Sequence, residues 1–256
     1  MQGLPQPPDQ PNVDGCPMVE LSDDPVDVEY LLKALYIPTF HCQNKLPLAV
    51  VAAFIRLGRK YDFKDLFNSA VARLTSDCPA TLEEYDVVQT EFKTIEEHSD
   101  IMLDLITLAS QNNIMSILPC AYYYALQDYS LAELFDGVQK SDGTVASLSP
   151  ADLRRCVIAK EKLLAKQLQP GYTLGWARKW EFDDCTSHPR CRVLREAILI
   201  RQSDDAAIHA LTPLSWFRRL SFCATCALHV ADSVKAGRKK MWDELPGFFD
   251  LPPGAS

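Results

Sequence analysis

Apolar residues recur at intervals of three and four positions along most of the chain, which is the spacing of amphipathic helices. In the N-terminal half such stripes run over residues 28–35, 51–58, 66–74 and 101–109. Asp24 and Pro25 precede the first stripe. An acidic side chain at the start of a helix interacts favourably with the positive end of the helix dipole. We therefore expect a succession of helices, each buried along the face that carries its stripe.

Helical spacing continues in the C-terminal half, where prolines lie at or near the helix limits. Helices are expected over residues 150–168, after Pro189 and over 213–246. Residues 136–148 are polar and contain glycine, so they are expected to form a linker.

The N-terminal segment differs from the rest of the chain. Residues 1–17 contain five prolines and are predicted to form a flexible leader. Residues 18–21 (MVEL) alternate weakly, which predicts one short strand. The sequence thus predicts a mostly α fold with at most one or two short strands near the N-terminus.

Composition and charge are those of an ordinary globular protein. Hydrophobic residues make up 47% of the 256 positions and charged residues 23%, so a sizeable core can form. The net charge of −8 disfavours binding to a nucleic-acid backbone, which needs a positive field. A basic cluster in the last 40 residues is expected to be a solvated helix face: Arg218, Arg219, Arg238, Lys239 and Lys240.

Membrane and secretory signals are not found in the sequence. No apolar run approaches the roughly 18 residues of a membrane span. The N-terminus has neither the basic start nor the apolar stretch of a secretory signal. The nine cysteines, an odd number, are therefore expected as reduced thiols inside the cell, in the cytoplasm or the nucleus.

Four cysteines in the C-terminal third form a candidate metal site: Cys185, Cys191, Cys223 and Cys226. The last two form a CxxC pair, and the first two have five residues between them. Four thiolates suit a tetrahedral zinc ion, and a closed site of this kind would be structural. His188 and His229 are further candidate ligands. The alternative is that the four are buried free thiols, because cysteine is among the most buried residue types.

The sequence gives little support for catalysis. The CxxC pair lacks the strand–helix setting of a thioredoxin-like redox site, and Ala227 stands where haem attachment needs histidine. Neither GxSxG nor HExxH occurs, and no glycine loop suits a phosphate. His41, His98 and His209 are expected to be structural or solvated. We expect no catalytic residue and no cofactor besides the candidate zinc.

The C-terminal tail is rich in aromatic and apolar side chains. The segment FFDLP follows Pro246 and Gly247, beyond the last expected helix. Its side chains must either fold back onto the protein or meet a partner, and folding back is the default expectation.

Two segments carry a resemblance to a known family. They are VELSDDPVDVEYLLKALYIPTF followed by LPLAVVAAFIRLGRKYDFKDLFNSAVARL, and the tail AGRKKMWDELPGFFDLP. The first resembles the second half of a BTB (POZ) domain of the expanded fungal branch, and the second resembles the end of such fungal proteins. The resemblance implies a BTB-like helical subdomain over 18–76, a helical extension over 77–135 and a C-terminal helical region over 149–251.

The resemblance also implies a function in protein binding. BTB domains bind other proteins, their own copies included, and the corresponding edge here carries Tyr36, Phe40, Tyr61 and Phe63. Tyr61 and Phe63 are also expected to wedge into a joint between two helices, where Gly58 lets the helices approach closely.

The chain departs from the family pattern in two ways. Only the proline-rich leader precedes Val19, so the resemblance lacks the N-terminal half of a BTB domain and most of the family's dimer interface. The loop over residues 37–45 has no glutamate, whereas BTB domains that recruit cullins carry a hydrophobic–x–Glu signature there. Cullin binding is therefore disfavoured.

The sequence as a whole predicts a non-catalytic protein-interaction module, an adaptor or scaffold. Two alternatives stay open. One is a zinc-stabilised module that contacts nucleic acid through the basic cluster. The other is a degenerate BTB fragment without activity.

Overall fold

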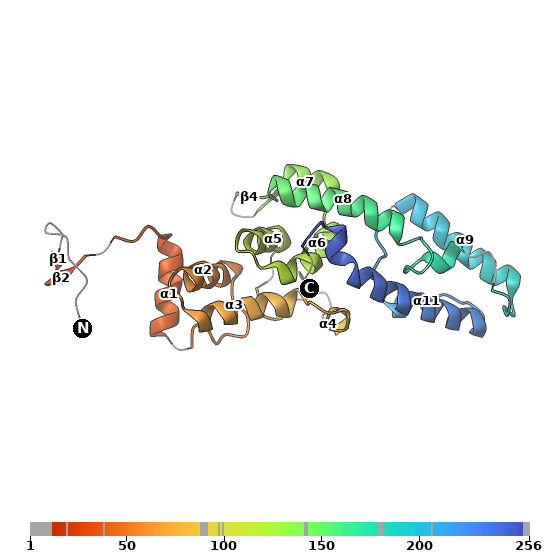
Figure 1. Ribbon diagram of the computed structural model, residues 1–256, viewed down its shortest axis with the longest axis horizontal. Coiled ribbons are helices and arrows are strands. Elements are labelled where there is room, and N and C mark those ends of the chain that lie inside the picture. The colour runs from red at the N-terminus through yellow and green to blue at the C-terminus, as the bar shows by residue number, and fades with distance from the viewer. Residues whose placement is uncertain are drawn as a thin grey trace.

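The described part of the protein is built from helices joined by loops, with two small β-hairpins (Figure 1). The computed structural model describes residues 12–18, 20–37, 39–87, 92–96, 98, 100–140, 143–178, 182–205 and 207–252. The helices are α1 Pro25–Tyr36, α2 Leu48–Lys60, α3 Lys64–Asp77, α4 Leu82–Val87, α5 Ile101–Gln111, η1 Met115–Ile117, α6 Leu118–Asp128, α7 Leu131–Asp136, α8 Pro150–Lys166, η2 Gly175–Arg178, α9 His188–Asp205, α10 Leu214–Phe217, α11 Ala224–Asp243 and α12 Leu245–Phe248. The predicted mostly α fold is confirmed.

The N-terminal hairpin lies earlier in the chain than the predicted strand. Strands β1 (Asn12–Val13) and β2 (Cys16–Pro17) pair antiparallel around Asp14 and Gly15, which both have positive φ. An Asp-Gly turn of this kind matches the twist of a two-residue hairpin and therefore sets the pairing. The described residues 18, 20 and 21 are irregular, so the strand predicted at 18–21 is wrong. Most of the predicted leader, residues 1–11, lies outside the described residues.

The segment expected to be a linker contains the second hairpin. Strands β3 (Val138–Gln139) and β4 (Val145–Ala146) pair antiparallel. Ala146 and Leu148 are buried in the main core, so this segment packs onto the helices. Gly137 ends α7 with a φ of 79°, and a Cβ there would lie 2.5 Å from the Val145 side chain. Only glycine fits this position.

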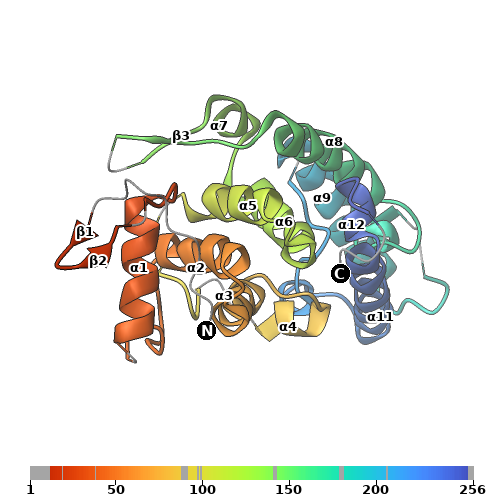
Figure 2. The same ribbon diagram turned by 60° about the vertical axis from the view of Figure 1, so that its left-hand side comes forward.

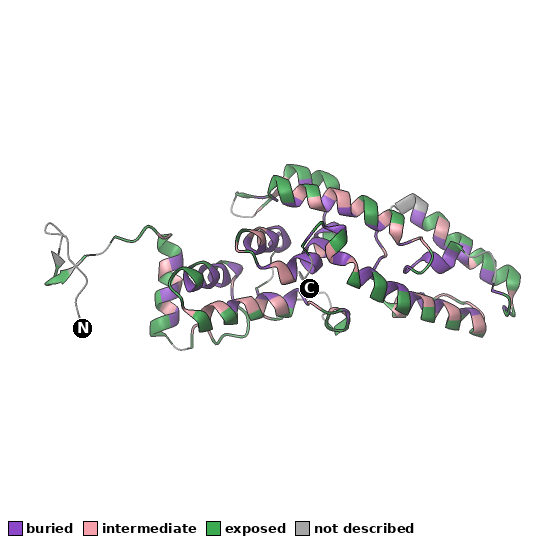
Figure 3. Ribbon diagram, viewed as in Figure 1, coloured by how far each residue is buried: buried purple, intermediate pink, exposed green. Residues whose placement is uncertain are grey.

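The main core is formed by side chains of helices α1 to α8 together with the C-terminal end of α11 and the tail that follows it. Buried side chains concentrate on α2, α5 and α6 (Figure 3). Helix α2 packs against α1, α3 and α5. Gly58 allows the close contact with α3, because a Cβ there would lie 3.1 Å from the Phe67 Cβ. Asp62 occupies the turn before α3 with a φ of 59°, and Phe63 takes the N-cap position.

A smaller core lies at the other end of the molecule, between η2, α9, α10 and α11. Leu174, Trp176, Phe217 and Val234 belong to it, and so do buried cysteines. Figure 2 shows α1, α2 and α3 on one side, α8, α9 and α11 on the other, and α5 and α6 between them. Helix α11 joins the two cores, because Val234 lies in the small core and Met241 in the main core.

The C-terminal tail folds back, as expected. Phe249 is fully buried, and its ring centre lies 5.0 Å from that of Tyr122 on α6. Leu251 is also buried in the main core. The apolar tail is therefore part of the protein's own core.

The helical stretch predicted over residues 213–246 is interrupted. Helix α10 ends at Phe217, and α11 begins only at Ala224 after a turn in which Phe222 donates its N–H to the Leu220 carbonyl. The break lets Cys223 cap α11 with its side chain. Among the described residues, no helix is both long and apolar enough to cross a membrane.

Candidate metal centre

Four cysteine side chains converge in the small core. The Sγ atoms of Cys185, Cys191, Cys223 and Cys226 all lie within 4.8 Å of one another. They come from three places in the chain: the loop before α9, the first turn of α9, and the start of α11. We call these four residues the cysteine cluster. The convergence expected of a metal site is therefore present.

The local backbone explains how α11 contributes two of the thiols. Cys223 is the N-cap of α11, and its Sγ accepts the Cys226 backbone N–H at 3.5 Å. A CxxC pair in the first turn of a helix places both sulfurs on the same side. The Cys223 N–H also donates to the Cys191 Sγ at 3.4 Å, which ties α11 to α9.

The distances fit a metal ion rather than a disulfide. All nine cysteines are free thiols, and the Cys185 and Cys223 sulfurs lie 3.9 Å apart. Thiolates bound at about 2.3 Å to a tetrahedral zinc ion lie about 3.8 Å from one another. The cysteine cluster thus offers four soft ligands with nearly the spacing that such an ion needs.

The thiols of the cysteine cluster differ in how readily they ionise: the pKa of one is lowered and the pKa of two others is raised. The N–H of Cys226, together with hydrogen bonds from Thr186, lowers the pKa of the Cys223 thiol to about 5. Burial raises the pKa of Cys191 and Cys226 above the ordinary value of a thiol. A cation placed between them would reverse that effect, because a coordinating thiol is deprotonated.

The two histidines considered as extra ligands lie outside the cluster. His229 pairs through Nε2 with Asp184 at 2.9 Å and stacks on Phe182, with the ring centres 4.6 Å apart. This pair connects the loop beside Cys185 to α11, which are two of the segments that the cysteine cluster also brings together. The hydrogen bond from His229 lowers the pKa of Asp184. His188 is exposed at the first position of α9.

The partner-binding residues predicted from the sequence are not equally accessible. Tyr36, at the end of α1, is 81% exposed. Tyr61 is also exposed, and its hydroxyl donates to Asp23 at 2.5 Å, so it does not wedge between helices as predicted. Phe40 is half-buried and stacks on Tyr30, and Phe63 is half-buried before α3. Only the two tyrosines are therefore open to a partner.

Helix α1 exposes apolar side chains that the stripe had placed in the core. Asp27, Leu31 and Ala34 are its buried residues, facing α2. Its exposed apolar residues, here called the α1 face, are Val26, Leu32, Leu35, Tyr36 and the adjoining Ile37. The prediction that Leu32 and Leu35 are buried is wrong, because α1 is apolar on more than one side and α2 covers only one of them.

A shallow groove runs along the part of the α1 face formed by Leu32, Tyr36 and Ile37. It has a volume of about 400 Å³ and is lined by Pro25, Val28, Glu29, Leu32, Lys33, Tyr36 and Ile37. Glu29 and Lys33 form an ion pair of 2.6 Å within the helix. The sequence signal that could have revealed this surface was the run Leu31, Leu32, Leu35, Tyr36 and Ile37, which is wider than one helical stripe.

A second cleft, between α2 and α5, has a volume of about 480 Å³. Two of its charged residues, Arg56 and Asp104, form ion pairs. Arg56 donates to both oxygens of Asp27, at 2.6 and 2.7 Å, and Lys140 binds Asp104 at 2.5 Å. The first pair joins α2 to α1, and the second joins α5 to the residue that follows β3.

The basic cluster predicted near the C-terminus does not form one surface. Arg238 is buried and bonded to Asp86 on α4, and Lys239 pairs with Asp243. Lys240 lies 4.2 Å from the centre of the Tyr172 ring. Arg218 and Arg219 are exposed in the turn after α10. The positive field that a nucleic-acid backbone needs is therefore weakened by acidic partners.

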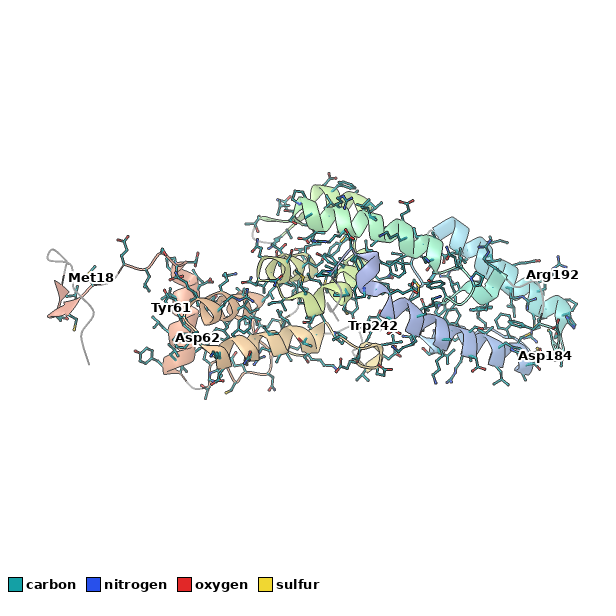
Figure 4. All side chains as sticks on the ribbon, viewed as in Figure 1. Met18, Tyr61, Asp62, Asp184, Arg192 and Trp242 are labelled. Atoms are coloured by element: carbon teal, nitrogen blue, oxygen red, sulfur yellow. The ribbon has the colours of Figure 1, made fainter. Side chains whose placement is uncertain are left out.

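The cysteine cluster and the α1 face lie at opposite ends of the molecule. Asp184 and Arg192, which adjoin Cys185 and Cys191, are at one end, and Tyr61 is near the other (Figure 4). Comparison with family models, with curated proteins and with solved structures found no match. The BTB resemblance therefore stays a prediction.

Proposed function

We propose that this protein is a non-catalytic protein-interaction module whose C-terminal part is held by one structural zinc ion. The observation that carries the proposal is the α1 face. Tyr36 is 81% exposed, and Val26, Leu32, Leu35 and Ile37 are each about half exposed, on one short helix. Leu32, Tyr36 and Ile37 line one groove, and exposed apolar surface of this kind is typical of sites where proteins bind one another.

Geometry favours a helical partner for this face. The groove along α1 is shallow and apolar, with one acidic and one basic residue at its side. A groove beside a helix accepts the apolar face of another helix, read at intervals of three and four residues. The resemblance of residues 19–76 to a BTB domain supports the same function.

The cysteine cluster supports a structural role for zinc. Four thiolates complete a tetrahedral shell, which leaves no position for a water molecule or a substrate. Three of the four cysteines are buried, and they join the loop before α9 to both long helices of the small core. When bound, the ion would cross-link these segments. The proposal assigns no reaction to the protein.

The interaction is tested with one substitution on the α1 face. Leu32→Glu places a charge in the centre of the apolar surface, and losing one anchor of an interface typically weakens binding at least about tenfold. Ile200→Glu is the matched control, because Ile200 is also an exposed apolar residue on a helix, 62% exposed on α9. Affinity capture followed by quantitative mass spectrometry compares both variants with the wild type.

The interpretation of this experiment depends on the difference between the two variants. We expect partners that the wild type and the Ile200→Glu variant both retain and the Leu32→Glu variant loses. Equal capture by all three proteins would contradict a binding function for the α1 face.

The zinc proposal is tested by comparing two buried cysteines. Cys191→Ala removes a ligand, whereas Cys156→Ala removes an equally buried thiol on α8; both side chains are 0% exposed. We expect one zinc per chain, measured by elemental analysis, in the wild type and the Cys156→Ala protein, and much less in the Cys191→Ala protein. Equal metal content in all three would count against this site.

A further inference from the structure

The turn between α10 and α11 carries two arginines followed closely by a serine. Its residues are Arg218, Arg219, Leu220 and Ser221, so Ser221 has arginine both two and three positions before it. The sequence contains other adjacent basic pairs, but none of them has serine or threonine at this spacing. Both arginines and Ser221 are exposed, whereas Leu220 is half-buried. The turn therefore presents a hydroxyl group beside two positive charges at the surface.

The side chains of these three exposed residues are not engaged by the fold. Arg238 and Lys239, which belong to the same basic cluster in the sequence, pair with acidic residues. Within the described part of the chain, by contrast, Arg218 and Arg219 form no ion pair and the Ser221 hydroxyl forms no hydrogen bond. The two guanidinium groups and the hydroxyl are therefore open to another protein.

The backbone of the turn is held by local hydrogen bonds. The N–H of Arg218 donates to the Leu214 carbonyl at 3.1 Å, and that of Phe222 donates to the Leu220 carbonyl at 2.9 Å. Phe222 anchors the end of the turn to the small core, because its ring centre lies 5.7 Å from that of Trp176. Contacts this local can open while the long helices stay in place. The turn can therefore straighten enough to enter the groove of an enzyme.

We propose that Ser221 is phosphorylated by a serine kinase that selects arginine two and three positions before its target. Kinases discriminate substrates by charge pattern, and acidic side chains in a kinase groove pair strongly with guanidinium groups. The γ-phosphoryl group of ATP is transferred to the Ser221 Oγ: a new O–P bond forms, the bond to the β-phosphate oxygen breaks, and ADP leaves. The hydroxyl proton passes to the catalytic carboxylate of the kinase. The α1 face takes no part in this site.

A phosphate on Ser221 would change the charge of the turn. It carries about two negative charges at pH 7, which offset the two positive charges of Arg218 and Arg219. Ser221 lies just before Cys223, the N-cap of α11, and negative charge near this end of a helix is favourable. The modification should therefore neutralise an exposed basic surface without unfolding the small core.

Phosphorylation of the folded, full-length chain is the test. The catalytic subunit of cyclic-AMP-dependent protein kinase, supplied with ATP and magnesium, serves as a kinase of this class, and mass spectrometry locates the phosphate. We expect one phosphate on Ser221 in the wild type and none in the Ser221→Ala protein. Ser215→Ala is the matched control, because Ser215 is also exposed, on α10, but has no arginine at the two preceding positions. Its phosphorylation should equal that of the wild type.

Two further variants test the requirement for charge. Arg218→Ala and Arg219→Ala each remove one ion pair with the kinase, so the initial rate should fall at least about tenfold. Arg154→Ala is the control, because Arg154 is an exposed arginine of another basic pair, on α8. Its rate should match that of the wild type. Circular dichroism shows whether each variant keeps its helicity.

The outcomes either support the assignment of Ser221 or overturn it. Phosphate confined to Ser221, with slow modification of both arginine variants, supports it. Phosphate on another residue, wild-type rates for both arginine variants, or no phosphate on the folded chain overturns it. Phosphorylation of the heat-unfolded chain alone also overturns it, because the turn would then be closed to a kinase in the native protein.

Discussion

Arg238 shows how a single charged residue can be placed inside this protein. Its side chain is 7% exposed, its Nε donates to the Leu211 carbonyl at 3.1 Å, and its Nη1 donates to Asp86 at 3.0 Å. From the sequence, Arg238 belonged to a basic cluster expected on a solvated face. The carboxylate that pairs with it lies 152 positions away, and no local pattern reports such a distant contact.

Arg238→Ala should destabilise the fold more than a change at its exposed neighbour. The substitution leaves the Leu211 carbonyl without its donor and the Asp86 carboxylate without its cation, which we expect to cost about 2–3 kcal/mol. Lys239→Ala removes an exposed pair with Asp243 and should cost less than about 1 kcal/mol. Urea unfolding measures both, and equal midpoints would contradict the role given to Arg238.

Helix α11 is the element on which both cores depend. It is capped by Cys223 beside the small core, and its last turn contains Trp242, whose Nε1 donates to the Ala80 carbonyl at 3.3 Å. Gly237 lies at its crossing with the chain after α8. A Cβ at Gly237 would stand 2.4 Å from the Tyr172 backbone carbon and 2.5 Å from the Thr173 nitrogen, so the backbones meet directly.

Gly237→Ala should therefore force α11 away from the Tyr172 backbone. Overpacking against backbone atoms costs typically about 1–3 kcal/mol, and here we expect the upper end. Gly247→Ala is the control, since no atom lies within 4 Å of a Cβ there and its φ is not positive. Thermal unfolding should show a lower midpoint for the Gly237 variant alone; a similar midpoint for both would show that α11 can shift without loss.

Helix starts were predictable because their signals are local. Asp24 and Ser149 cap α1 and α8 through their side chains, and Ser130 with Glu133 forms a complete capping box at α7. The two-residue strands were not predictable, because pairings so short have no measurable periodicity. Which apolar residues of α1 are buried also could not be read from its spacing, because that depends on how much of the helix α2 covers.

At the scale of the whole molecule, two cores of different size share one chain. The main core is rich in large aliphatic and aromatic side chains, whereas the small core is lined by four cysteines and a few aromatic residues. The sequence identified the four cysteines through their type and spacing, and their convergence is confirmed. It could not show that the loop before α9 reaches α11, nor that the α1 face lies at the opposite end.

Unequal cores imply that metal should stabilise one part of the molecule more than the other. The four thiols connect the loop before α9, helix α9 and helix α11, and two of them have a pKa raised by burial, so without a cation they are poorly ionised. Loss of the ion should therefore loosen residues 188–205 and 224–234. Residues 101–128 lie in the main core and should keep their protection.

Hydrogen exchange before and after chelation tests most directly whether the cysteine cluster holds the small core. We predict that the protein purified without added metal contains zinc, and that chelation speeds amide exchange in α9 and in the first half of α11 while α5 and α6 stay protected. Identical exchange in both forms, or firm protection of α9 and α11 in a protein that holds no metal, would contradict a structural metal centre.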